Sequence, residues 1–133
     1  ETNAFCVDID AYDCPPEQYT KRAFHARFWP DGKVSHYARP KPESKGEKYD
    51  PEEWTKPGRI DVPALSFMPG EWFDVAIRAD LKTATFDLTV AGKTVQGLQF
   101  AQQNTHRIQT IGFYPNTDNC TMHLDSVRVV VTP

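Results

Sequence analysis

The stretch GEWFDVAIRADLKTATFDLTVAG, residues 70–92, alternates apolar and polar residues in two runs that a short polar segment separates. An alternation with a period of two predicts a β-strand with one buried face, so the stretch predicts two strands joined by a turn. It contains no catalytic motif, and it therefore predicts structure rather than chemistry. The residues expected to face the core are Phe73, Val75, Ile77, Ala79, Ala84, Phe86, Leu88 and Val90.

Short runs on both sides of this hairpin show the same alternation, and turn-forming residues separate them. Seven glycines and eleven prolines are dispersed along the chain, as in a β-protein with frequent turns. Pro63 predicts an edge strand or a bulge in its run, and a change of apolar phase near Asp125 and Ser126 predicts a bulge in the last run. With the hairpin, eight to nine strands are expected, which predicts an all-β antiparallel sandwich. The flanking runs are residues 3–12, 22–29, 33–39, 59–67, 94–100, 107–115 and 121–131.

Length and composition limit the classes of protein that remain. The 133 residues correspond to one domain, residues 1–133, and the net charge of -3 disfavours a nucleic-acid partner. No apolar run is long enough to span a membrane. The first methionine is Met68, so we expect a processed product or part of a longer chain. Cys6, Cys14 and Cys120 form either one bridge with a free thiol or three thiols.

The order of motifs around the hairpin resembles the concanavalin A-like, or laminin-G-like, jelly-roll domains. The similar features are Gly-x-Trp, two alternating strands around an Asp-containing turn, Ala-Gly, the later IGFYPN and the terminal HLDSVRVV, within residues 70–131. The resemblance implies an antiparallel jelly-roll sandwich of the carbohydrate-binding-module type, in a secreted or cell-surface protein. The Glu-x-Asp-x-x-Glu strand of the laminarinase-like members is absent, so the resemblance does not imply that activity.

The hairpin within residues 22–39 is the first candidate site, because its polar face carries unusual chemistry. Arginine binds carboxylate or sulfate groups, and aromatic rings stack on sugars, so this face predicts a glycan site. The alternative is that this face is only exposed to solvent and has no binding function. The same residue types also fit a lyase, in which His25 or Tyr37 removes a proton and Arg27 neutralises a uronate. The residues of this face are His25, Arg27, Trp29, Ser35, Tyr37 and Arg39.

Two further candidates lie outside this hairpin. Trp54, in the charged and proline-rich residues 40–58, is expected either to pack as a lid or to contact a ligand. Asp125 resembles a structural calcium ligand of jelly-roll modules, with Asp8 or Asp10 as a second ligand. Capping of a bulge is the alternative for Asp125. Trp72 is expected to pack in the core or at an edge.

The sequence therefore predicts a β-sandwich that binds a polysaccharide without cleaving it, with no cofactor or with structural calcium. A lyase that acts on an acidic glycan is the first alternative. A structural or protein-interaction domain, associated with another domain or chain, is the second.

Overall fold

The computed structural model describes residues 7–15, 22–38, 58–102, 105, 107–115 and 121–131. These residues form eight β-strands and no helix, which confirms the all-β prediction. Since the described residues contain no helix, they also contain none that could cross a membrane. The strands are β1 (Val7–Tyr12), β2 (Arg22–Phe28), β3 (Lys33–Ala38), β4 (Gly58–Ser66), β5 (Val75–Asp80), β6 (Thr85–Val90), β7 (Lys93–Gln99) and β8 (Thr110–Pro115).

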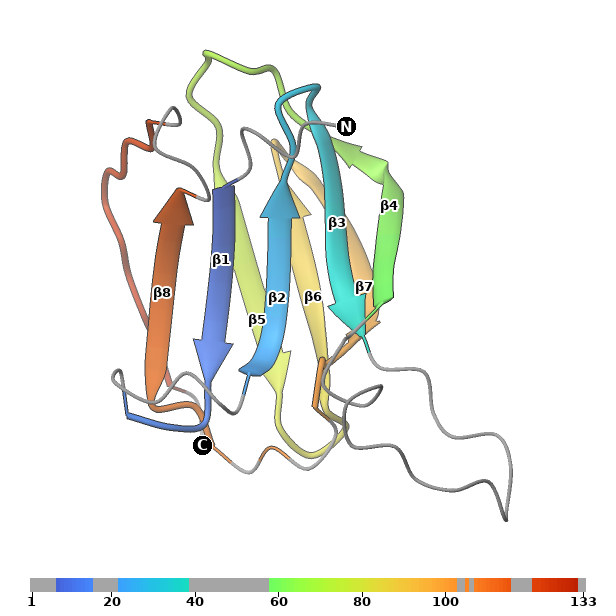
Figure 1. Ribbon diagram of the computed structural model, residues 1–133, viewed down its shortest axis with the longest axis vertical. Helices are drawn as coiled ribbons and strands as arrows, with labels where there is room; N and C mark the ends of the chain where they lie inside the picture. The colour runs from blue at the N-terminus through green and yellow to red at the C-terminus, as the bar shows by residue number, and fades with distance from the viewer. Residues whose placement is uncertain are drawn as a thin grey trace.

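The strands form two antiparallel sheets that pack face to face as a β-sandwich (Figure 1). The larger sheet has the order β4-β3-β2-β1-β8, and the smaller sheet has the order β5-β6-β7. β4, which contains Pro63, is an edge strand, and its pairing with β3 contains a register shift. The edge position and the irregularity expected from Pro63 are therefore both present.

The core lies between the sheets and consists mainly of aliphatic and aromatic side chains. Phe86 of β6 is 1% exposed, and its ring stacks on that of Phe24 of β2 at a centroid distance of 5.1 Å. The buried positions of β6 are those predicted from the 70–92 stretch. His36 of β3 also faces this core, where only 3% of it is exposed and its ring lies 5.9 Å from the Phe86 ring. Burial lowers the pKa of this imidazole.

The turn between β6 and β7 consists of two residues with left-handed backbone conformations. Ala91 has φ 49° and Gly92 has φ 87°. Positive φ at both central residues is the requirement of a type I′ turn, which matches the twist of the strands that it connects. Glycine adopts this conformation without strain, whereas alanine does not.

Two features of the fold differ from the sequence-based expectations. Trp72 is 72% exposed, so it packs neither in the core nor against an edge, although its ring lies 6.4 Å from that of His123. Residues 121–131 form no strand, and Ser126 has φ 56°, which interrupts an extended run where the bulge was expected. The apolar side chains beyond this point stay exposed: Val127, Val129, Val130 and Val131.

Candidate functional site

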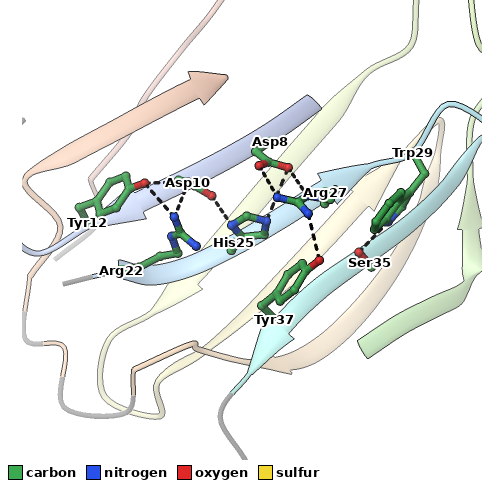
Figure 2. Close-up of polar contacts among 9 residues, drawn as sticks. All are labelled: Asp8, Asp10, Tyr12, Arg22, His25, Arg27, Trp29, Ser35 and Tyr37. Atoms are coloured by element: carbon green, nitrogen blue, oxygen red, sulfur yellow. Dashed lines mark hydrogen bonds and ion pairs between the residues drawn. The ribbon is translucent and has the colours of Figure 1, made fainter. Parts of the chain in front are cut away.

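The outer face of the five-stranded sheet carries a group of charged and aromatic residues (Figure 2). Successive side chains of a strand point to opposite faces, so those between the core-facing residues of β1, β2 and β3 point outward. The antiparallel register places Asp8 opposite Arg27 and Asp10 opposite His25. It also places Arg27 opposite Ser35 of β3. We call the following residues the outer-face cluster: Asp8, Asp10, Tyr12, Arg22, His25, Arg27 and Tyr37.

Arg27 connects three strands within this cluster. Its Nε donates a hydrogen bond to Asp8 Oδ1 at 2.6 Å, and its Nη2 donates to Asp8 Oδ2 at 2.8 Å. Its Nη1 donates to the hydroxyl of Tyr37 at 3.1 Å. This bidentate geometry matches the fork of a guanidinium to the two oxygens of a carboxylate, and it fixes both side chains. Arg27 keeps 18% of its side chain exposed, against 8% for Asp8.

His25 lies between the two carboxylates of β1. Its Nδ1 is 2.7 Å from Asp10 Oδ1, and its Nε2 is 3.6 Å from Asp8 Oδ1. The edge of its ring meets Tyr37 at a centroid distance of 4.6 Å. Only 2% of the side chain is exposed. Burial acts to lower the pKa of His25, but the contacts with Asp10 and Asp8 outweigh it and raise the pKa.

The same balance of burial against partners fixes the charge of Asp8. Burial acts to raise the pKa of this carboxyl group, but the hydrogen bonds from Arg27 and the contact with His25 lower it below the usual range. Asp8 is therefore ionised at neutral pH.

Arg22 and Tyr12 close the cluster at the end of β1. The Tyr12 hydroxyl donates to Asp10 Oδ2 at 2.7 Å. Arg22 Nη2 donates to the Tyr12 hydroxyl at 3.4 Å and lies 3.5 Å from Asp10 Oδ2. Arg22 Nε is buried without a hydrogen-bond partner, while 37% of the side chain is exposed.

Trp29 and Arg59 extend the outer face beyond the cluster. The indole Nε1 of Trp29 donates to Ser35 Oγ at 2.8 Å, and the Arg59 guanidinium carbon lies 3.8 Å from the Trp29 ring centroid. Arg59 Nε in turn donates to Asp61 Oδ1 at 2.7 Å. These contacts hold the indole and the guanidinium against each other, so that they form a stacked pair at the surface.

The acidic side chains of the cluster are buried more deeply than its arginine side chains. The side chains of Asp8 and Asp10 are 8% and 3% exposed, whereas those of Arg27 and Arg22 are 18% and 37% exposed. Both oxygens of Asp8 accept hydrogen bonds from Arg27 and Asp10 Oδ2 accepts one from Tyr12, whereas Asp10 Oδ1 has no hydrogen-bond partner among the described residues. A molecule that approaches this face meets mainly guanidinium groups and aromatic rings.

The structure brings together four of the predicted ligand-binding residues: His25, Arg27, Trp29 and Tyr37. Arg39, Trp54, Cys6 and Cys120 lie outside the described residues, and Cys14 is a buried free thiol.

The three residues predicted as calcium ligands have different surroundings. Asp8 and Asp10 belong to the outer-face cluster. Asp125 is exposed and its Oδ1 accepts a hydrogen bond from Ser126 at 3.3 Å. Within the described ranges, no three histidine, cysteine or acidic residues are placed to hold a metal ion together.

Sequence reasoning missed Tyr12, Arg22 and Arg59. Tyr12 follows Asp8 and Asp10 in the same alternation, so the signal for it was present. Arg22 shares the alternation phase of the core residue Phe24, but a register shift at Ala11 and Tyr12 places it opposite Tyr12. A bulge of this kind leaves no clear trace in sequence. Arg59 reaches Trp29 only through the pairing of β4 with β3.

No family model, curated protein or solved structure matches this chain. The case for a function therefore rests on the geometry and chemistry of the outer face.

Proposed function

We propose that this chain is a carbohydrate-binding module with a concanavalin A-like jelly-roll fold, and that it binds a polysaccharide outside the cell. The ligand surface in this proposal is the outer face of the five-stranded sheet, around Arg27, Tyr37, Trp29 and Arg59. The observation that carries the proposal is the fixed array of guanidinium groups and aromatic rings on this face.

Two properties of this array suit a sugar ligand. Hydroxyl, carboxylate and sulfate groups of a glycan accept hydrogen bonds from guanidinium groups, and the C–H faces of sugar rings pack on flat groups. The side chains are also held in place by their own contacts, so little conformational entropy is lost when a ligand binds. The stacked pair of Trp29 and Arg59 provides the flat part, with 39% of the Arg59 side chain exposed.

Binding without cleavage is favoured over a lyase reaction by the state of His25. A general base must be unprotonated and must reach the proton that it removes. His25 is 2% exposed, and the contacts with Asp8 and Asp10 stabilise its protonated form. A buried histidine whose protonated form is stabilised by two carboxylates fits a structural or electrostatic role better than proton abstraction.

Affinity electrophoresis through gels that contain soluble polysaccharides tests the proposal. We expect the wild-type chain to be retarded by at least one polysaccharide, and Trp29→Ala and Arg59→Ala to lose most of that retardation. The matched controls are Trp72→Ala, in the exposed turn before β5, and Arg78→Ala, on the outer face of the smaller sheet. Both controls should bind as the wild type does.

Three results would contradict the proposal. Equal losses in the control variants and in Trp29→Ala and Arg59→Ala would place the ligand elsewhere. Release of unsaturated uronate products from an acidic polysaccharide, detected by their ultraviolet absorbance, would identify a lyase. No retardation by any polysaccharide would leave a structural or protein-interaction domain.

A further inference from the structure

His25 is surrounded by charged and titratable groups from every strand that packs against it. Two carboxylates of β1 lie beside the ring nitrogens of His25, and two guanidinium groups belong to the same strand as His25, β2. The phenol ring of a tyrosine on β3 meets the edge of the His25 ring. A second histidine acts on it from the core side of β3, where burial keeps its own pKa low. These groups are Asp8, Asp10, Tyr12, Arg22, Arg27, Tyr37 and His36.

The contacts of the ring favour the doubly protonated form. A neutral imidazole carries one N–H group and one lone pair. Nδ1 lies 2.7 Å from Asp10 Oδ1 and Nε2 lies 3.6 Å from Asp8 Oδ1, and neither nitrogen has a hydrogen-bond partner in the part of the chain that the structure describes, so the unprotonated nitrogen of a neutral ring would lie beside a carboxylate. Protonation removes this repulsion and gives both carboxylates a positive neighbour.

The imidazolium changes the net charge of the cluster. The carboxylates of Asp8 and Asp10 are balanced by the guanidinium groups of Arg22 and Arg27, as the ion pairs show. The proton on His25 therefore leaves one excess positive charge. The carboxylates are buried more deeply than the arginine side chains. The excess charge therefore makes the electrostatic potential at this face more positive.

We propose that the ligand of the outer face is an acidic glycan, carboxylated or sulfated, and that the imidazolium of His25 supplies the excess positive charge that favours it. His25 is a positioning residue in this account, because it is buried and does not touch the ligand. Affinity falls as the pH rises and His25 loses its proton. The inference rests on the proposed function, since it names the ligand class for the same face.

The test compares three soluble oligosaccharides of similar length, one carrying uronates, one sulfated and one neutral. Calorimetric titration over a pH range around neutrality gives their affinities for the wild-type chain. We expect the acidic ligands to bind more tightly than the neutral one, and to weaken by about tenfold on deprotonation of His25, the equivalent of one pKa unit. Comparison of the uronate ligand with the sulfated ligand shows which of the two anionic groups is bound more tightly.

Two variants move the charge of the cluster in opposite directions. His25→Gln removes the titratable charge, so its affinity for the acidic ligand should be about tenfold weaker at low pH and independent of pH. Asp10→Asn removes a negative charge, so it should bind the acidic ligand more tightly than the wild type at high pH. A variant that is merely misfolded cannot bind more tightly. His123→Gln, an exposed histidine next to Trp72, should keep the wild-type pH profile.

Equal affinity for neutral and acidic ligands, a flat wild-type profile or no gain in Asp10→Asn would each overturn this inference. Binding of the neutral ligand alone would still leave the proposed carbohydrate-binding function intact. Absence of binding to all three ligands, together with no retardation by any polysaccharide, would instead overturn the proposed function itself.

Discussion

Replacing Arg27 with methionine tests the central ion pair of the outer face. The substitution keeps most of the apolar stem but removes the two hydrogen bonds of 2.6 and 2.8 Å to Asp8, whose side chain is 8% exposed. Removal of one partner from a buried pair costs about 3–5 kcal/mol. The nearby imidazolium of His25 still compensates part of the charge of Asp8, so we expect the low end, about 3 kcal/mol.

Urea unfolding, followed by circular dichroism, measures this loss in the free energy of unfolding. At about 4 °C per kcal/mol, the melting temperature should also fall by roughly 12 °C. The control is a double-mutant cycle with Asp8→Asn, which removes the charge that Arg27→Met leaves unpaired. The double variant should be more stable than Arg27→Met alone.

The reasoning would be refuted if Arg27→Met lost less than about 1 kcal/mol, the value typical of an exposed pair. Additive effects in the double variant would refute it as well, because additivity means that the two side chains do not interact.

The remaining predictions concern the turn between β6 and β7 and the two buried histidines, His36 and His25. Ala91→Gly should raise the free energy of unfolding by about 0.5–1 kcal/mol, because glycine adopts the φ of 49° without strain; a decrease in thermal unfolding experiments would contradict this. His36 has its pKa lowered by burial, so its contribution to stability is full above its unfolded pKa and is lost as the pH falls toward its folded pKa. When the pH is lowered from 7 to about 5, the free energy of unfolding of His36→Phe should therefore fall less than that of the wild type, as measured in unfolding experiments. His25 has a raised pKa, so its contribution has the opposite sign: it is full below the unfolded pKa and is lost as the pH rises through the folded pKa. His25→Gln should accordingly lose more stability at acidic than at alkaline pH, and equal losses at both would count against the ionised imidazolium.

The parts of the fold that sequence predicts are those in which alternation decides burial. The 70–92 stretch places Phe86 and Leu88 in the core because every second residue of a strand shares a face. The same rule places Asp8, His25 and Arg27 on the outward face, and β1 and β2, which follow each other in the sequence, pair as neighbours. The fold class and half of the site follow from these local patterns.

The parts that sequence does not predict depend on non-local pairing. Arg22 reaches Asp10 only through a register shift, and Arg59 reaches Trp29 from a strand distant in the sequence. Residues 121–131 have the pattern of a strand, but no described strand pairs with them. Alternation shows which residues have the pattern of a strand, whereas backbone pairing with a neighbouring strand decides whether they join a sheet.

Chemical-shift mapping by nuclear magnetic resonance tests the location of the ligand surface most directly. An acidic oligosaccharide is titrated into the labelled chain, and the amide and indole signals that move are assigned to the sheets. The account predicts shifts for β1, β2, β3 and β4 and for the indole N–H of Trp29, with β5, β6 and the indole of Trp72 unaffected. Shifts confined to the smaller sheet or to the turn that contains Trp72 would contradict it.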